Sequence, residues 1–339
     1  MPEPRRARWV VGPKLYLSLV IVVMAAYFGA RAPGFLTLGN LVDVLEGSSV
    51  TAILAIGLFV VLVVGGIDIS FAATASVVQY VAAYASTAWA LPPLLVVPVS
   101  LLVGAVLGGI NALLIDRLKA TSIIITISTM SVYFALLMYF TGGRSIYELP
   151  TWWTHPVVFA QWAGEDGASV RVTLPIVVMA VVAVFTAFVM NRSTLGRQIY
   201  ALGGNVEAAR RAGVNLLVIQ VVAYGYLGLL AGLAGLVQAH RVGEAVPNAM
   251  VGGELFVLAA AVLGGASLSG GLGSVGGVML GILLLALLRN GLNLLGISPY
   301  LFQILLGVVI LASAALTGLK LRRAHSAGTA MPGSGAAAT

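Results

Sequence analysis

The sequence has no cysteine, few charged residues and only three histidines. Charged side chains make up 9% of its 339 residues, while hydrophobic ones make up 60%. The absence of cysteine excludes a disulfide framework and a thiolate metal site. His155, His240 and His325 have no metal-ligand spacing between them. A mean hydropathy of +1.05 further excludes an ordinary soluble domain, so the chain is expected to lie in a membrane.

The motifs of common enzymes are also missing. No Walker A sequence for ATP and no HExxH zinc motif occurs. Ser267 and Ser269 stand outside any GxSxG frame and have no histidine nearby in the sequence. An intramembrane hydrolase in which His240 pairs with a distant serine is therefore disfavoured. The chain is expected to be neither an enzyme nor a metalloprotein.

Long apolar runs are what the chain has in quantity. A helix needs about 20 apolar residues to cross the hydrocarbon core, and the 41 glycines suit close helix packing in lipid. The fold class predicted is all-α, a polytopic membrane protein with about ten transmembrane helices, some broken by glycines. The expected spans are 15–30, 50–64, 71–90, 93–115, 121–140, 173–190, 218–238, 252–266, 272–295 and 299–318.

The basic residues predict the orientation of these spans. An even number of spans places both termini on one side, and thirteen of the 18 Lys and Arg residues then share that side: Arg5, Arg6, Arg8, Lys14, Arg117, Lys119, Arg192, Arg197, Arg210, Arg211, Lys320, Arg322 and Arg323. By the positive-inside rule it is the cytoplasm. We expect a cytoplasmic segment at 1–14, a transmembrane domain at 15–318 and a disordered cytoplasmic tail at 319–339.

Two segments between spans carry more polar residues than their neighbours. The 33–49 segment contains Asp43 and Glu46, and is interpreted as a separate short helix near the outer surface or buried among other helices. The 141–171 loop then faces outward with Trp152, Trp153 and Trp162. Tryptophans of this kind suit a membrane interface or a docking surface, and interface anchoring is the favoured interpretation.

The most polar internal stretch is the loop at 191–217. Asn205 is a suitable N-cap residue for a short helix, and Glu207 lies in the first turn of that helix. Arg210 and Arg211 lie in its last turn, and Gly213 can adopt the left-handed conformation that ends a helix. So short a helix is marginal alone in water. It is either a capped loop that packs on its own protein or a handle for a cytoplasmic partner.

Two glycine-containing segments resemble each other. VVGGIDIS at 63–70 and VLGGASLS at 262–269 share Gly-Gly-x-x-(Ile/Leu)-Ser. The paired glycines, Gly65 with Gly66 and Gly264 with Gly265, are predicted to break apolar helices. Corresponding broken segments in two halves of a transporter indicate its substrate pathway. A chance match remains open, because glycine pairs are common in this chain.

Polar residues within apolar runs are the candidates for the pathway. A membrane-embedded charge such as Asp68 costs about 2.5–3.5 kcal/mol on insertion scales, so it either caps the next helix together with Ser70 or contacts the pathway. Amides within spans either join helices or bind a hydroxyl-rich solute. The candidates are Asp68, Ser70, Asn111, Ser267, Asn290 and Asn293. Gln303 is a further amide within an apolar run. Glu254 is expected to complement a helix N-terminus, and Arg289 is expected to extend toward the interface.

A set of motifs in order resembles a known family. GGIDIS (65–70), TLGRQIYALGGNVEAARRAGV (194–214), ELFVLAAAVLGGASLSGGLGSVGG (254–277) and NGLNLLGISPY (290–300) look like the permease subunits of bacterial ABC importers for monosaccharides, the ribose, xylose, rhamnose and autoinducer-2 group. The match runs from about Phe35 to Leu316. Family members typically have GGIDLSVG where this chain has GGIDISFA.

The resemblance implies an inner-membrane permease without cofactors of its own. Its implied partners are an ATP-binding cassette subunit that holds ATP and Mg²⁺, an extracytoplasmic sugar-binding protein, and a second permease, either an identical copy or a sister chain. The loop 191–217 then resembles the ATPase-coupling loop of ABC importers. Its residues would be Arg197, Asn205, Glu207, Ala208, Ala209, Arg210 and Gly213.

Two classes of transporter remain for comparison. An importer permease predicts alternating access powered by a partner, which agrees with a missing ATP site and a structured cytoplasmic loop. A secondary transporter driven by an ion gradient would instead need an essential membrane carboxylate, either Asp68 or Glu254.

Overall fold

The computed structural model describes residues 13–164, 169–308 and 311. Its elements are α1 (Pro13–Arg31), α2 (Leu38–Val64), α3 (Phe71–Ala88), α4 (Pro93–Leu118), α5 (Ser122–Thr141), α6 (Thr151–Thr154), β1 (Val158–Ala163), β2 (Ser169–Thr173), α7 (Leu174–Arg192), α8 (Thr194–Gly204), α9 (Val206–Arg211), α10 (Leu216–Val242), α11 (Glu254–Leu263) and α12 (Val275–Leu294). A further apolar helix spans Pro299–Val308. The predicted tail at 319–339 and most of the segment 1–14 lie outside the described residues.

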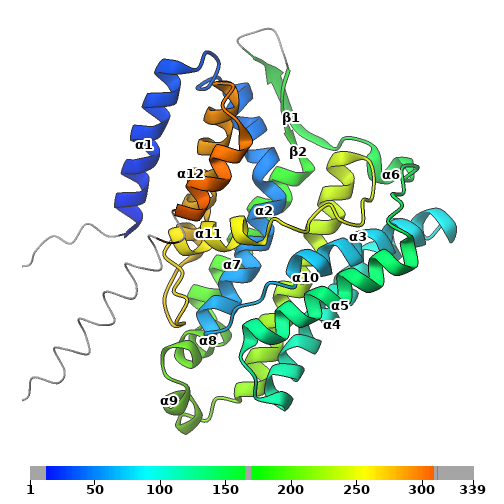
Figure 1. Ribbon diagram of the computed structural model, residues 1–339, viewed down its shortest axis with the longest axis vertical. Coiled ribbons are helices and arrows are strands. Elements are labelled where there is room, and N and C mark those ends of the chain that lie inside the picture. The colour runs from blue at the N-terminus through cyan, green and yellow to red at the C-terminus, as the bar shows by residue number, and fades with distance from the viewer. Residues whose placement is uncertain (1–12, 165–168, 309–310, 312–339) are drawn as a thin grey trace, which may run out of the picture.

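The long helix α2 is the centre of the fold. It is apolar around its whole circumference from residue 50 to residue 64, a pattern typical of a helix surrounded by protein. In its most apolar 18-residue window 83% of the residues are buried, against 11% for α1 at the edge of the molecule. Figure 1 shows α1, α11 and α12 on one side of α2 and α3, α4, α5 and α10 on the other.

Small residues allow the tightest helix packing, between α4 and α10. Gly104 and Gly108 on α4 face Gly228 and Gly232 on α10 so closely that added Cβ atoms would overlap the opposite backbone. Such contacts are common between helices in lipid, where van der Waals packing replaces the hydrophobic effect as the driving force. The crossing fixes α10 against α4 and, through its other faces, against α2 and α3.

Helices occur at the predicted spans, but those at 71–90 and 252–266, α3 and α11, are not among the helices long and apolar enough to cross a membrane, and the segment 33–49 needs a correction. Within the described ranges, seven helices are long and apolar enough to cross a membrane: α1, α2, α4, α5, α7, α10 and α12. The prediction of a separate short helix at 33–49 is wrong, because α2 begins at Leu38 and runs unbroken through this segment. Both acids lie in the N-terminal third of α2, where Asp43 borders a polar cavity and Glu46 accepts a hydrogen bond from Thr173 at 2.8 Å. The total of ten spans stays a prediction.

The loop after α5 contains an antiparallel hairpin, β1–β2, which the all-α description lacked. Trp153 lies in the neighbouring helix α6, and the prediction that it anchors the loop at a membrane interface is wrong. That side chain is buried, and its Nε1–H donates to the Leu236 carbonyl of α10 at 3.1 Å. A ring nitrogen of His240 contacts the Trp153 carbonyl. Trp153 therefore attaches the loop to α10 and does not anchor it at a membrane interface.

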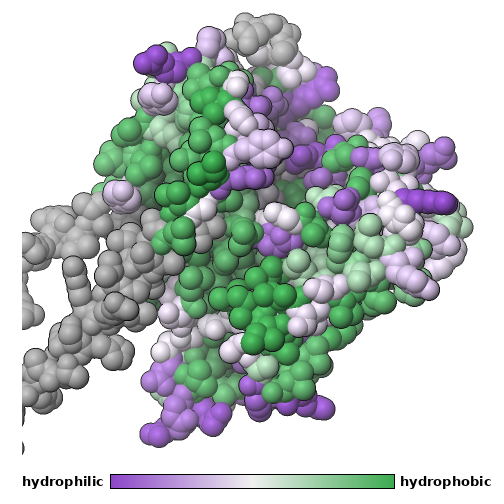
Figure 2. Space-filling view, in the orientation of Figure 1, coloured by the Kyte–Doolittle hydropathy of each residue, from purple (hydrophilic) through white to green (hydrophobic). Residues whose placement is uncertain are grey.

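The surface divides into an apolar middle and polar ends. Figure 2 shows hydrophobic residues over the centre of this face and hydrophilic ones gathered near α9 and at the opposite end. The hairpin lies at the end opposite to α9 (Figure 1). This distribution is what a protein crossing a bilayer requires.

Candidate functional site

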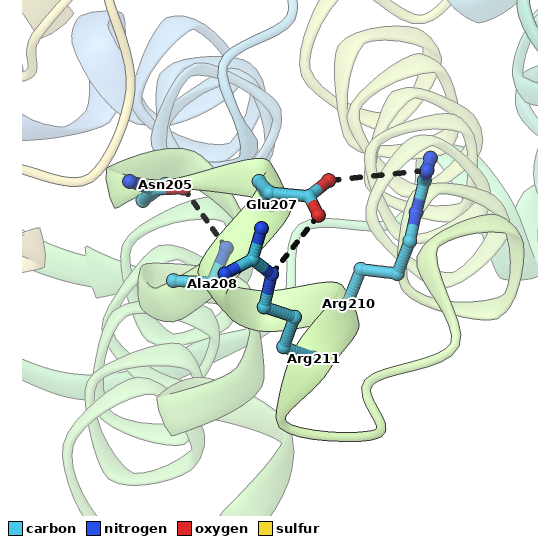
Figure 3. A network of polar contacts seen from close by, with 5 residues as sticks. All are labelled: Asn205, Glu207, Ala208, Arg210 and Arg211. Atoms are coloured by element: carbon cyan, nitrogen blue, oxygen red, sulfur yellow. Dashed lines mark hydrogen bonds and ion pairs between the residues drawn. The ribbon is translucent and has the colours of Figure 1, made fainter.

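The short helix α9 has the caps that the sequence predicts. Asn205 accepts a hydrogen bond from the Ala208 backbone N–H at 2.9 Å (Figure 3). Gly213 follows the helix with a φ of +80°. The Gly213 N–H donates to the Arg210 carbonyl at 3.0 Å. Both ends of a helix too short to be stable alone are thus satisfied by its own flanking residues.

The charged side chains of α9 form a small exposed cluster. Glu207 accepts from Arg211 Nε at 3.1 Å and lies 4.0 Å from Arg210 (Figure 3). Exposed pairs of this kind contribute about 0–1 kcal/mol. Ala209 is buried on the opposite face of the helix. The helix is therefore seated on the protein by one face and presents its charges to solvent by the other.

A second helix in the same loop, α8, was not predicted. Ser193 caps it by accepting from the Gly196 N–H at 3.0 Å, and Ile199 and Leu202 are buried. The spacing of these two apolar residues, three apart, was the available signal. Arg197 lies on the exposed side, where it donates to Thr194 at 3.0 Å. Thus the residues predicted for ATPase coupling lie on two consecutive helices and the turn after them.

Three predicted pathway residues meet at the first glycine break. Asp68 is buried, and one of its oxygens accepts from both the backbone N–H and the hydroxyl of Ser70 at 2.7 Å. Asn111 of α4 donates to the other Asp68 oxygen at 3.1 Å and to the Ser70 hydroxyl at 2.7 Å. Asp68 therefore binds the N-cap residue Ser70 itself and joins α4 to the break, whereas no side chain caps the free N–H groups in the first turn of α3.

Two residues of α5 that the sequence analysis did not single out complete this break. Ser122 accepts from the Ile67 N–H at 2.9 Å, and Thr126 accepts from the Ile69 N–H at 3.3 Å. Backbone that is neither helix nor strand is tolerated at membrane depth where protein groups satisfy it. Hydroxyls at 122 and 126, four residues apart in an apolar run, were the sequence signal.

The second glycine break repeats the first with a shift of one residue. Gly65 has a φ of +96°, and the next N–H, of Gly66, donates back to Val61. After α11 it is Gly265, with a φ of +90°, that takes this role, and Ala266 donates back to Ala261. Both are the Schellman ending of a helix. The matching sequences pair Gly65 with Gly264. In the structure the residue equivalent to Gly65 is instead Gly265, so both helices end in the same way but one residue apart in the alignment.

The remaining pathway candidates lie apart from Asp68. Ser267 organises its own loop, where its hydroxyl accepts from the Ser269 N–H at 3.1 Å. Asn290 of α12 forms a reciprocal pair of amide hydrogen bonds with Asn40 of α2, at 2.9 and 3.0 Å. Asn290 thus joins two helices, the first of the two roles open to it. Asn293 is exposed.

Asn293 lies in a cavity of about 380 Å³ between α2, α10, α11, α12 and the helix that follows. The cavity is near the N-terminal end of α2, opposite to the end near α8. Its polar lining residues are Asp43, Ser48, Thr51, Arg241, Arg289, Asn290 and Asn293. Arg289 therefore borders this cavity. Such a mixture of hydroxyls, amides and both charge signs offers donors and acceptors to a hydroxyl-rich solute.

Comparison with known proteins assigns the family. Residues 40–314 match the family described as branched-chain amino acid transport system / permease component. The chain belongs to this permease family. It is 34% identical over 312 residues to the ribose import permease protein of Escherichia coli K12, covering 92% of this chain and 95% of that one.

Two other relatives have similar coverage. The D-allose transport system permease protein of Escherichia coli K12 is 32% identical, over 88% of this chain and 90% of its own. The galactose/methyl galactoside import permease protein of Salmonella typhimurium is 32% identical, over 93% and 96%. No solved structure gives a significant match. The permease is thus a transporter subunit of the inner membrane.

The second membrane carboxylate of the permease, Glu254, is held by backbone. It is buried at the start of α11, and both its oxygens accept from the Gly252 N–H, at 2.9 and 3.1 Å. In the described part of the chain, neither Glu254 nor Asp68 forms an ion pair. Glu254 orders the turn before its helix, as its expected place at that N-terminus suggests.

Asn290 and Asn293, two amides on α12, allow a direct test of a helix-joining role against an exposed position in the permease. Asn290→Ala removes both bonds to Asn40 and is expected to cost about 1 kcal/mol, the range measured for hydrogen bonds between membrane helices. Asn293→Ala removes no hydrogen bond that the structure contains, so stability is expected to be unchanged. Thermal unfolding of the two purified variants in detergent measures the difference. Equal melting temperatures would contradict the assignment of Asn290 as a helix-joining residue.

Proposed function

We propose that the permease is the membrane subunit of an ATP-driven importer that moves a monosaccharide or similar small polyol by alternating access. The observation that carries the proposal is α9, a fully capped helix that exposes its charged face beside a membrane domain with no Walker A motif. The printed names of the relatives, which import ribose, allose and galactose, support a sugar as the substrate.

The proposal requires three partners. An ATP-binding cassette subunit holds ATP and Mg²⁺ and binds the loop 191–217 in the cytoplasm, where both termini of the permease also lie. An extracytoplasmic sugar-binding protein delivers the substrate at the opposite end. A second permease, identical or a sister chain, completes the membrane core. The clustering of basic residues at the α9 end supports this orientation.

The substrate is proposed to enter through the cavity that contains Asn293. That cavity lies at the far end of α2 from α8, which makes it the extracytoplasmic end in the proposed orientation. Its polar lining suits weak contacts with sugar hydroxyls, while the buried set of Asp68, Ser70 and Asn111 connects elements at the inner end. Ser267 and the glycine breaks are proposed to move during the cycle and not to bind the sugar.

An ion-coupled secondary transporter is the alternative. It needs a carboxylate that gains and loses a proton or cation during transport. Asp68 and Glu254 are the two acids proposed for this role, and each is occupied by hydrogen bonds that hold a turn. Those contacts favour a structural role for both acids and therefore the ATP-driven importer.

Reconstitution into proteoliposomes tests the proposal. Uptake of radiolabelled ribose, allose and galactose is measured with the permease alone, under a proton or sodium gradient, and with its ATPase and binding protein plus enclosed ATP. Uptake of one sugar is expected only with all components and ATP. Gradient-driven uptake by the permease alone would overturn the proposal. A catalytically inactive ATPase subunit is the matched control for the complete system.

A further inference from the structure

Three separate segments meet backbone to backbone at Gly203, near the end of α8. Gly203 lies against the carbonyl oxygen of Val63 in the last turn of α2, and a Cβ added to it would overlap that oxygen. The same Cβ would stand 2.6 Å from the backbone nitrogen of Gly271. The Gly271 N–H donates to the Val63 carbonyl at 2.8 Å, so it satisfies a free carbonyl at the end of α2.

The third segment is the loop 264–274, which also approaches without side chains. An added Cβ on Gly270 would stand 2.9 Å from the Gly65 Cα and 3.1 Å from the Gly203 Cα. Both glycine breaks therefore touch one point on α8. We name this meeting of Gly203, Val63, Gly65, Gly270 and Gly271 the glycine junction.

A side chain of α8 reinforces the glycine junction. The Tyr200 hydroxyl donates to the Gly273 carbonyl at 2.9 Å, one helical turn before Gly203. Burial raises the pKa of the Tyr200 phenol, so the group stays protonated and remains a donor. Gly273 belongs to the same loop as Gly270 and Gly271. The loop is thus held to α8 at two points, one through backbone packing and one through a hydrogen bond.

The junction is close to the coupling helix in sequence and in space. Asn205 ends α8 by donating its N–H to the Ala201 carbonyl at 3.0 Å, and it also begins α9 by accepting from Ala208. Only Gly204 separates Asn205 from Gly203. Because no flexible linker lies between α9 and Gly203, a displacement of α9 is expected to move Gly203 and, through it, the end of α2 and the loop 264–274.

Each segment that leaves the junction leads to a different part of the membrane domain. From Val63 and Gly65 the chain enters the break that contains Asp68, which is bonded to α4 through Asn111. From Gly270 and Gly271 the loop continues into α12 and leads back to α11. One contact on α8 thus reaches both groups of helices that flank α2.

We propose that Gly203 is a positioning residue through which movement of α9 is passed to both glycine breaks at once. The inference rests on the proposed ATP-driven function and names the contact that links the ATPase to the membrane helices. It requires that residue 203 have no side chain, because any Cβ separates α8 from α2 and the loop.

Neighbouring glycines supply a matched pair of variants. Gly203→Ala is expected to lower the ratio of sugar transported to ATP hydrolysed by about fivefold or more, within the range of known couplings between sites. Gly204→Ala is the control, because its added Cβ meets nothing within 4 Å and its φ is not positive. It is expected to match the wild type. Both ratios are measured in proteoliposomes that contain the complete transporter.

The outcomes separate the two proposals. If the wild-type complex couples ATP hydrolysis to uptake and Gly203→Ala does so equally well, the glycine junction is overturned while the importer function stands. If the wild-type complex itself shows no ATP-driven uptake, the proposed function fails first.

A second measurement avoids substitution at Gly203 itself. Because the chain has no cysteine, spin labels can be attached at Gly204→Cys and Ser269→Cys, two exposed positions on either side of the junction. Their distance is expected to stay constant between the nucleotide-free and ATP-bound complex, while the distance from Gly204→Cys to a label at Ser169→Cys, an exposed position on β2, changes. A label pair across the junction that separates on ATP binding would overturn the inference.

Discussion

Asp68→Ala is expected to remove most of the folded permease from the membrane. The substitution leaves the Ser70 N–H, the Ser70 hydroxyl and the Asn111 amide without their buried acceptor. Each orphaned donor costs about 1–3 kcal/mol, so the loss is about 3 kcal/mol or more. That is a large share of the roughly 5–15 kcal/mol by which native proteins are stable. Fluorescence-detected chromatography of the solubilised protein measures it.

Asp68→Asn is the informative comparison. Its amide oxygen can accept both hydrogen bonds from Ser70. If the Asn111 amide rotates by 180°, its oxygen, which has no partner in the structure, can accept from the new amide, in exchange for the bond that the Asn111 nitrogen donates to the Ser70 hydroxyl. The variant is therefore expected to fold and to transport at close to the wild-type rate. If instead it folded but did not transport, the carboxylate charge would be essential, and the ion-coupled alternative would regain support.

Combined substitution of Glu207→Lys and Gly213→Pro is expected to abolish coupling to the ATPase. Proline cannot adopt the φ of +80° at position 213, and it lacks the N–H that bonds to Arg210. Lysine at 207 replaces two attractive contacts on α9 with repulsion between like charges. Transport and sugar-stimulated ATP hydrolysis are expected to fall by roughly tenfold or more, equivalent to about 1.4 kcal/mol of coupling.

The membrane domain should survive this change, because only Ala209 of α9 is buried. A matched control is available at the other end of α10. Gly243 has a φ of +79°, donates its N–H to Ala239 at 2.8 Å and has open space around it. Glu148→Lys with Gly243→Pro therefore makes the same change of charge and again places proline at a positive φ, but at the opposite end of the molecule. If both double variants stimulated ATP hydrolysis equally, the coupling role of α9 would be refuted.

The elements that sequence predicts well are those determined by local chemistry. The caps at Asn205 and Gly213 follow from neighbouring residues alone, and the apolar runs locate most of the long helices within a few residues, the start of α2 excepted. The glycine breaks also follow locally, because only glycine ends a helix readily in the left-handed conformation.

Features that depend on distant partners were missed. Asp43 and Glu46 favoured a separate short helix, yet α2 runs through both residues, and Glu46 accepts a hydrogen bond from Thr173 at the end of β2. Trp153 is buried because α10 offers a carbonyl, which lies 83 residues away in sequence. Gly203 has importance only through Val63 and the loop 264–274. Neither the hydrophobic periodicity nor the composition of a segment predicts such contacts with distant segments.

The polar face of α3 has a consequence for how the protein is made. Thr74, Ser76 and Gln79 are all buried within the protein, and α3 is not among the helices apolar enough to cross a membrane by themselves. When these residues are exposed to lipid, each polar group without a hydrogen-bond partner raises the free energy of the inserted segment. Its stable insertion is therefore expected to wait for α4, which follows directly, and for α10, which leaves the ribosome more than a hundred residues later. Until then α3 is expected to depend on the insertion machinery.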